Sequence, residues 1–421
     1  MNSTFNISLI SIGDELCIGQ TLNTNVQWMS KELVKVGANI DYHLTIKDDK
    51  AEIIKAIEFL KSSSDVILVT GGLGPTHDDI TKKVLIEYFD DKLALNEKVL
   101  ADLKEYFKTR GRDFLERHYE QALMPSRCKI IENKVGTAQG MLFQGDGFEL
   151  LSMPGVPREM QYIMSNNFIE YIENRIKKNN HNVIVYRTLR TAGVPESTLA
   201  DLIGEVGFLN GASLAFLPSY AGVKLRIGTN SENFDNAKIE LDKLEKFIMD
   251  RCGKYIYSNS DENLENYLAS LLLENKKTIS GAESCTGGLF GAKITAMPGS
   301  SSYFNGSAVT YSNNAKIDIL GVRKETISNF GAVSEECAKE MAIGSREKYK
   351  TDYAISITGI AGPDGGSESK PVGTIWIGLS SSNDTYAKKF VFTKDREVNR
   401  ELSVHNAINL LVKEIEKEVG N

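Results

Sequence analysis

The chain has 421 residues, more than one ordinary domain holds, so two or three domains are expected. Its 41% hydrophobic and 25% charged residues are typical of a globular protein and exclude a disordered or fibrous chain. A formal net charge of −7 disfavours nucleic acid as a partner, because contacts to phosphates need a basic face.

The spacing of the cysteines and the hydropathy of the chain indicate the cellular compartment of the protein. Five cysteines lie far apart, with no CxxC pair and no histidine at zinc-site spacing, which fits free thiols in a reducing cytoplasm. The N-terminal residues lack the features of a signal peptide, and no segment approaches the ~18–20 apolar residues of a membrane span. We therefore expect a cytoplasmic protein without a membrane partner.

Strand-like and helix-like runs alternate along residues 1–177. Apolar runs predict strands at 7–12, 66–70 and 150–153, and helical periodicity predicts helices at 26–36, 53–60 and 158–177. Glycines follow two of these strands, at Gly71 and at Gly155. This alternation predicts an α/β domain with a parallel sheet.

Residues 183–257 predict a small α+β domain. Strands are expected at 183–191, 213–216, 223–228 and 254–257, and helices at 196–203 and 234–251. We expect no GXXG loop of an RNA-binding KH module here, so the segment is interpreted as a spacer or dimerisation domain. A third α/β segment, 260–421, follows a polar turn.

The third segment places hydroxyls and glycines where a strand passes into a helix. The motif ESCTGG (283–288) lies between a predicted strand at 278–282 and a predicted helix at 289–296. Free backbone N–H groups and the positive end of a helix dipole suit a phosphate at this point. Routine helix capping by Ser284 or Thr286 is the alternative.

The serine run PGSSS (298–302) precedes the next predicted strand, 307–312, and Lys316 follows it. Serine is a poor nucleophile without a base, and His405, the only histidine of this segment, is far away in the terminal helix. Lys316 opens a predicted helix, where burial and the helix dipole both lower the pKa of an amine. It is either a general base or a surface lysine.

The strand predicted at 353–358 runs into GIAGPDGG (359–366), which indicates either close backbone approach to a ligand or a flexible loop. Arg396, near the start of the last helix, either reaches an anionic ligand or stays at the surface. The candidate substrate- and phosphate-binding residues of this segment are Thr286, Gly287, Gly288, Gly359, Gly362 and Arg396.

Six motifs in this order resemble the C-terminal domain of the CinA family over about 260–421: AESCTGG, PGSSSYF, TYSNNAK, GAVSEE, GIAGPDGG and KPVGT. The resemblance implies a nicotinamide-mononucleotide amidohydrolase with a Ser/Lys dyad. By motif position, Ser301 is the implied nucleophile, Lys316 its base and Tyr311 a helper at the dyad. Ser284 is the reserve nucleophile.

The chemistry that the resemblance implies is acyl transfer. Ser301 attacks the carboxamide, backbone N–H groups hold the oxyanion, and Lys316 protonates the departing ammonia. Water then releases nicotinate mononucleotide. No metal is expected for this step.

The first segment carries a second candidate site. Glycines and a hydroxyl can cradle a phosphate, and carboxylates suit a Mg²⁺-like or transition-metal ion, although acidic residues in a first helical turn are common. The expected nucleotide-site residues are Gly71, Gly72, Gly74, Thr76, Gly155 and Glu159. The expected metal ligands are Asp14, Asp78 and Asp79.

Three motifs of this segment resemble the CinA N-terminal domain: GDELCIGQTLNTN, GGLGPTHDD and MPGVPREM. That domain is similar to molybdopterin-binding domains and is associated with metal-dependent ADP-ribose pyrophosphatase activity. The resemblance implies a two-site hydrolase of pyridine-nucleotide salvage, taking nicotinamide mononucleotide and ADP-ribose, and a homodimer. Two alternatives are a molybdopterin-related nucleotidyl-transfer enzyme and a non-catalytic interaction protein connected with competence or DNA damage.

Overall fold

The computed structural model describes residues 4–74, 79–206, 211–220 and 222–420. Contacts divide the chain into two compact units. The first comprises Met1–Tyr186, Leu209–Ala212 and Gly228–Lys243, and the second comprises Arg187–Phe208, Ser213–Ile227 and Leu244–Asn421. None of the helices within the described ranges is both long and apolar enough to cross a membrane.

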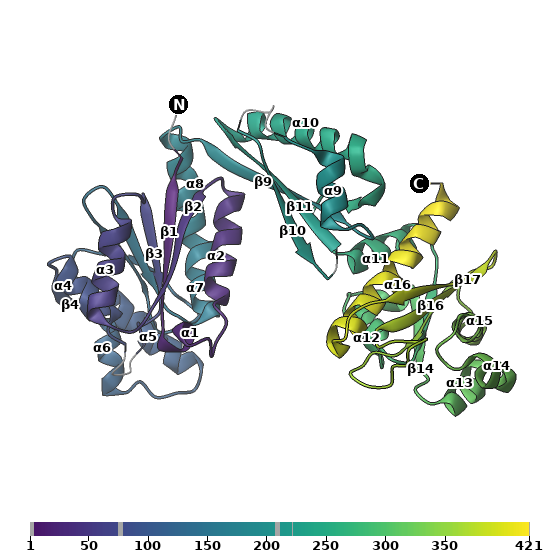
Figure 1. Cartoon of the computed structure of the whole chain (residues 1–421). Helices are drawn as coiled ribbons and strands as arrows, with labels where there is room; N and C mark the ends of the chain where they lie inside the picture. Colours follow the sequence, from purple (N-terminus) through teal and green to yellow (C-terminus); the bar gives the residue numbers. More distant parts are fainter. Residues whose placement is uncertain (1–3, 75–78, 207–210, 221, 421) are drawn as a thin grey trace. The chain divides into compact units, whose positions relative to one another are not determined.

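A six-stranded sheet organises the N-terminal segment (Figure 1). Its order is β2 (Asn39–Ile46), β1 (Asn6–Ile12), β3 (Val66–Thr70), β8 (Glu149–Met153), β7 (Gly140–Gln144) and β6 (Lys129–Ile131). The first four strands pair in parallel, and β7 and β6 pair antiparallel. The predicted parallel sheet is confirmed, while β2, β6 and β7 were not predicted.

Both faces of this sheet are covered by helices. Along β1, Ile7 and Leu9 join one buried cluster while Ile10 and Ile12 join another, as the two-residue period of a strand requires. Such near-continuous apolar runs are typical of parallel strands that are buried on both sides. The helices are α1 (Asp14–Cys17), α2 (Thr24–Lys35), α3 (Lys50–Leu60), α4 (Thr81–Tyr88), α5 (Glu97–Thr109), α6 (Tyr119–Ala122), α7 (Pro157–Ile163) and α8 (Ile169–Lys178).

Smaller elements complete the segment. They are β4 (Leu93–Leu95) and β5 (Leu123–Pro125), which pair with each other, and the 3-10 helix Glu116–His118. The π-helical turn Met164–Phe168 separates α7 from α8, so the single helix predicted at 158–177 is interrupted. Helical periodicity alone does not reveal a turn of this kind, in which hydrogen bonds span five residues instead of four.

The middle segment forms a four-stranded sheet, in the order β10 (Ser213–Ser219), β11 (Gly222–Ser231), β9 (Val183–Thr191) and β12 (Ile256–Ser258). Its helices are α9 (Glu196–Ile203) and α10 (Phe234–Cys252), and the 3-10 helix Gly253–Tyr255 precedes β12. The expected absence of a GXXG sequence is wrong, because Gly204, Glu205, Val206 and Gly207 follow α9 with that spacing. Gly207 lies outside the described residues.

The C-terminal segment is a five-stranded mixed sheet in the order β14 (Phe304–Val309), β13 (Ile279–Glu283), β15 (Tyr353–Gly359), β16 (Thr374–Ser380) and β17 (Thr385–Val391). β13 pairs in parallel with β14 and β15, whereas β16 and β17 are antiparallel. The helices are α11 (Leu264–Glu274), α12 (Leu289–Thr295), α13 (Asn313–Leu320), α14 (Lys324–Phe330), α15 (Glu335–Tyr349) and α16 (Arg396–Val419).

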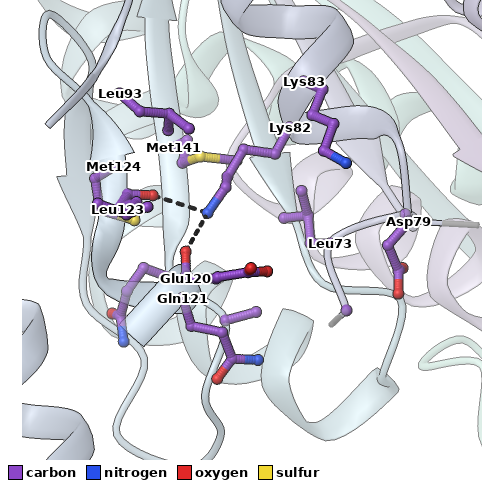
Figure 2. A pocket seen from close by; sticks show the side chains of 14 residues that line it. Leu73, Asp79, Lys82, Lys83, Leu93, Glu120, Gln121, Leu123, Met124 and Met141 are labelled. Carbon is purple, nitrogen blue, oxygen red and sulfur yellow. Dashed lines mark hydrogen bonds between the residues drawn. The ribbon is translucent and has the colours of Figure 1, made fainter. Parts of the chain in front are cut away.

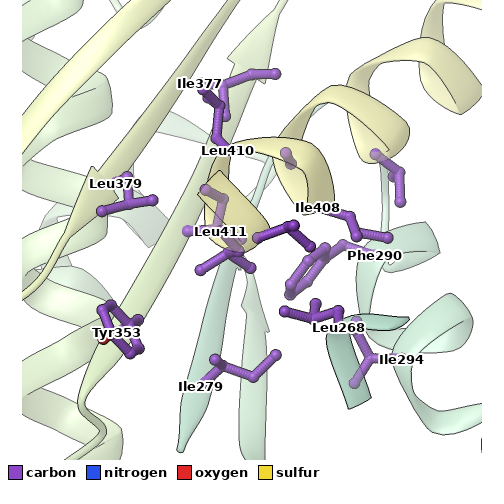
Figure 3. Packing of buried hydrophobic residues seen from close by; sticks show 14 of the residues in the cluster. Leu268, Ile279, Phe290, Ile294, Tyr353, Ile377, Leu379, Ile408, Leu410 and Leu411 are labelled. Atoms are coloured by element: carbon purple, nitrogen blue, oxygen red, sulfur yellow. The ribbon is translucent and has the colours of Figure 1, made fainter. Parts of the chain in front are cut away.

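The main C-terminal core lies between this sheet and helices α11, α12 and α16 (Figure 3). Phe290 of α12 and Leu411 of α16 are fully buried among strand residues such as Ile279 and Ile377. On the other face Leu320 of α13 and Met341 of α15 pack in a smaller cluster. This packing fixes α12 and α13, which begin beside the ends of β13 and β14.

Candidate active site

Three parallel strands end at one edge of the C-terminal sheet. Ser284 follows β13, Thr310 follows β14, and Gly359 ends β15. The backbone N–H of Ser284 donates to Ile357 O at 2.9 Å, and that of Thr310 donates to Glu283 O at 2.7 Å, so the strand pairing continues past both strand ends. Ligands of open α/β sheets bind at this edge.

Lys316 reaches this edge from the first turn of α13. Its side chain is 1% exposed, and Nζ donates to Ser284 Oγ at 3.0 Å and to Thr310 O at 2.8 Å. No described carboxylate forms an ion pair with this amine. Burial therefore lowers the pKa of Lys316, since little opposes the loss of hydration of the charged form.

The structure corrects the pairing predicted for Lys316, because its partner is Ser284 and not Ser301. Ser301 lies in the exposed one-turn 3-10 helix Ser300–Ser302. That turn precedes β14, whereas Lys316 follows it. A six-residue strand at ~3.3 Å per residue puts roughly 20 Å between the two ends.

The N-terminus of α12 is not available to a phosphate as predicted. The carboxylate of Glu283, which is fully buried, accepts hydrogen bonds from the backbone N–H groups of Gly288, Phe290 and Gly291, each at 3.0 Å. The N–H of Gly287 donates to Ser284 O. The Glu283 carboxylate thus occupies the helix N-terminus at which the motif ESCTGG predicted a bound phosphate.

Two backbone N–H groups beside Ser284 have no acceptor in another residue of the described part of the chain. They belong to Cys285, whose N–H lies against its own thiol, and to Thr286. Paired N–H groups directly after a nucleophile are the usual construction of an oxyanion hole. The Cys285 thiol is buried, which raises its pKa to about 11 and keeps it protonated near neutral pH.

Arg396 is the first residue of α16. It donates to Gly362 O at 2.8 Å and to the Tyr311 hydroxyl at 3.1 Å, and it makes no ion pair with a described carboxylate. Tyr311 is 63% exposed, and its hydroxyl accepts the hydrogen bond of Arg396. No described hydrogen bond joins Tyr311 to Lys316 or to either candidate serine. One turn later Arg400 donates to Thr286 O at 3.0 Å and pairs with Glu397.

Gly359 has a packing role instead of the predicted ligand contact. A Cβ there would lie 2.3 Å from Ile375 Cδ1 and 2.7 Å from Thr374 O, so only glycine lets β16 approach β15 this closely. Gly362 differs, since its carbonyl oxygen orients Arg396.

In the N-terminal domain the structure brings Gly71 and Gly155 together. A Cβ at Gly155 would lie 3.4 Å from Gly71 Cα, and Gly71 has φ +117°. Asn25 Nδ2 donates to Gly155 O at 2.7 Å and to Thr70 Oγ1 at 3.2 Å. Asn25 therefore links the ends of β3 and β8. In the sequence, only its position in the motif TLNTN indicated a role at this site.

The predicted metal ligands are only partly visible. Asp14 is the exposed first residue of α1, and Asp79 lies against Gly74, whose Cβ would meet Asp79 Oδ2 at 2.4 Å. Thr76 and Asp78 lie outside the described residues. Within the described ranges, no three His, Cys, Asp or Glu side chains form a group that could hold a metal ion. Because Asp78 lies outside these ranges, the three predicted ligands are not compared as a set, and no step is derived through a metal.

A cavity of about 290 Å³ adjoins Gly72 and Gly74 (Figure 2). Lys82 of α4 lines it, donating to Glu120 O at 3.0 Å and Leu123 O at 2.8 Å, and burial lowers its pKa. The other lining side chains are mixed: some are apolar, such as Met141, and others are polar or charged, such as Lys83 and Gln139. Lys82 was not predicted from the sequence, although a lysine in a first helical turn opposes the helix dipole and is therefore a signal of an unusual role.

Glu159 of α7 has a structural partner. It accepts a hydrogen bond from Asn133 Nδ2 at 2.7 Å, and burial raises its pKa. Glu159 therefore holds the loop that begins at Asn133 in place. Among the described hydrogen bonds, none joins Glu159 to the residues around Gly71.

Three family models match successive parts of this chain. Residues 8–174 match the family described as "Probable molybdopterin binding domain", 186–258 the damage-inducible protein CinA KH domain, and 261–415 the CinA C-terminal domain. A CinA-like protein of Flavobacterium psychrophilum is 41% identical over 420 residues, covering 97% of this chain and 98% of that protein. A CinA-like protein of Cytophaga hutchinsonii is 39% identical over 421 residues and covers both chains fully.

A solved structure is also similar to part of this chain. The competence/damage inducible protein CihA from Agrobacterium tumefaciens is 36% identical, covers 36% of this chain and 92% of its own, and has a TM-score of 0.35. The family matches and the fold define an α/β protein with a molybdopterin-binding-like domain at its N-terminus. It belongs to the CinA family.

Proposed function

We propose that the C-terminal domain is a serine amidohydrolase, with Ser284 as nucleophile and Lys316 as general base. The observation that carries this proposal is the 3.0 Å contact between the buried Lys316 amine and Ser284 Oγ. In its neutral form the amine has two N–H bonds and one lone pair. With one N–H donated to Thr310 O, the neutral amine keeps its lone pair for the proton of the serine hydroxyl.

The reaction follows from these positions. Ser284 Oγ attacks the carboxamide carbon while Lys316 takes the hydroxyl proton, and the N–H groups of Cys285 and Thr286 receive the oxyanion. The C–N bond then breaks as the ammonium of Lys316 returns the proton to departing ammonia. Water, deprotonated by the same amine, attacks the acyl-enzyme and releases the carboxylate and free Ser284.

The substrate we propose is nicotinamide mononucleotide, which would become nicotinate mononucleotide in pyridine-nucleotide salvage in the cytoplasm. The motif resemblance supports the pyridine carboxamide. Arg396 supports a substrate with a phosphate, because its guanidinium carries donors and a positive charge that no described carboxylate neutralises. The proposed phosphate position therefore moves from the start of α12 to Arg396.

The direct test is ammonia release from nicotinamide mononucleotide by the purified full chain. Ser284→Ala should abolish the reaction, and Ser301→Ala, a matched change in the exposed 3-10 helix, should leave it intact. A chain that releases no ammonia would refute the proposed activity. Loss in Ser301→Ala with turnover in Ser284→Ala would restore the first assignment of the nucleophile.

A second activity is proposed for the N-terminal domain, a metal-dependent ADP-ribose pyrophosphatase. The close junction of Gly71 with Gly155 and the adjoining cavity at Gly72 support a phosphate-bearing ligand. A molybdopterin-related nucleotidyl transfer is the alternative for this domain. Release of AMP and ribose phosphate from ADP-ribose would support the pyrophosphatase, whereas adenylylation of molybdopterin would support the nucleotidyl transferase. Sedimentation of the full chain tests the proposed homodimer.

A further inference from the structure

Glu283 is a fully buried carboxylate next to the proposed nucleophile, and it forms no ion pair with a cation in the described part of the chain. Burying a charge is costly unless hydrogen bonds replace its hydration. Five donors do so here, at 2.8 to 3.0 Å: Thr286 Oγ1, Gly288 N, Phe290 N, Gly291 N and Ser307 Oγ.

These donors come from separate parts of the site. Thr286 and Gly288 belong to the turn after the nucleophile, Phe290 and Gly291 to α12, and Ser307 to the neighbouring strand β14. One carboxylate therefore ties the turn to a helix and to a strand. A charged acceptor makes stronger hydrogen bonds than a neutral one, so this link is stiff.

The same bonds decide which backbone N–H groups face a substrate. From Gly287 to Gly291 every N–H has an internal acceptor: Ser284 O, Thr286 O or the carboxylate of Glu283. Cys285 and Thr286 are the two left over within the described turn. We propose that Glu283 is a positioning residue that fixes the oxyanion-binding N–H groups of Cys285 and Thr286. This inference rests on the amidohydrolase proposed above.

The variant Glu283→Gln tests the idea with little change in volume. Each carboxylate oxygen of Glu283 accepts at least two hydrogen bonds, whereas the amide keeps one oxygen and turns an NH₂ group toward the remaining donors. The turn must shift to relieve this conflict. We expect kcat for nicotinamide mononucleotide to fall about 100-fold, the usual loss for a misplaced oxyanion donor, with KM nearly unchanged.

Two readouts separate positioning from general damage. The midpoint of the pH–rate profile should stay where it is in the unmodified chain, because Glu283 does not contact Lys316. Inhibition by pyridine-3-boronic acid, which forms a tetrahedral adduct with a serine hydroxyl, should weaken about 100-fold, whereas the affinity for substrate, measured in a Ser284→Ala background, should hold.

Glu414→Gln is the matched control, since Glu414 is also a buried carboxylate of this domain but bonds to the Tyr386 hydroxyl. It should keep kcat and the boronate affinity. If Glu283→Gln does not fold, Ser307→Ala, which removes one donor, should lower kcat roughly fivefold at constant KM.

Some results would overturn the inference. They are an unchanged kcat in Glu283→Gln, equal losses in Glu283→Gln and Glu414→Gln, or, where Ser307→Ala must decide, an unchanged kcat in that variant. An unmodified chain that neither releases ammonia nor binds the boronate would instead remove the proposed function itself.

Discussion

The amine of Lys316 and the hydroxyl of Ser284 lie 3.0 Å apart, although 32 residues separate them in the chain. Parallel pairing of β13 with β14 produces this contact, because it brings the ends of both strands to one edge of the sheet. Lys293 of α12 offers a contrast, since it pairs with Glu401 at 3.1 Å. A buried amine without such a partner favours a chemical role over a structural one.

The first prediction concerns coupling within the dyad. Ser284→Ala and Lys316→Ala should each lower kcat by about 1,000-fold or more, because the nucleophile is inert without its base. The double variant should lose no more than the worse single variant, since the two groups act as one unit. Initial rates of ammonia release under saturating nicotinamide mononucleotide measure this.

Additive losses in the double variant would mean that the two side chains act independently. In that case the contact at 3.0 Å would be structural, and the proposed base would be wrong.

The second prediction is the pH dependence of amide hydrolysis. Only neutral Lys316 accepts a proton, and burial lowers the pKa of this amine below the ~10.4 of free lysine. Activity should therefore be lost as pH falls through the lowered pKa and should rise above it. A profile of kcat/KM from about pH 6 to about pH 9 reports this value for the free enzyme. Activity that declines steadily over that range would contradict the assignment.

Local sequence predicted much of the fold and the position of Lys316. The strand at 183–191 and the helix at 196–203 were predicted with the bounds observed, and Lys316 lies in a first helical turn as expected. Periodicity did not predict which serine meets Lys316, because that depends on which strand ends share an edge. The motif ESCTGG likewise indicates an anion at a helix start, but only tertiary structure identifies that anion as Glu283.

The third prediction concerns recognition of the substrate phosphate. Arg396→Gln should raise KM for nicotinamide mononucleotide about tenfold or more with little change in kcat, because a charge-assisted contact is lost far from the reacting carbon. The penalty should vanish with nicotinamide riboside, which has no phosphate. Lys394→Gln removes an equal charge from an exposed neighbour and should leave both values unchanged. An equal penalty for both substrates would place Arg396 in a purely structural role with Tyr311 and Gly362.

The fourth prediction concerns the helix that carries Lys316. A Cβ at Gly344 of α15 would lie 1.8 Å from Leu320 O, at the end of α13. Gly344→Ala should therefore push α13 outward, lower the free energy of unfolding by about 1–3 kcal/mol and reduce amide hydrolysis. Gly253→Ala is the control, because its Cβ would make an ordinary 3.4 Å contact with Met249. Thermal unfolding and ammonia release, measured on both variants, check this; a fully active Gly344→Ala would show that α13 tolerates the shift.

The fifth prediction separates the two proposed activities. The proposed metal ligands Asp14, Asp78 and Asp79 belong to the N-terminal domain, whereas the proposed amide chemistry uses Ser284 and Lys316. EDTA should therefore abolish hydrolysis of ADP-ribose by the full chain and spare ammonia release from nicotinamide mononucleotide. Asp79→Ala should likewise impair only the first reaction, and Ser284→Ala only the second. Equal loss of both reactions in EDTA would show that amide hydrolysis needs a metal, which would sink the Ser/Lys mechanism.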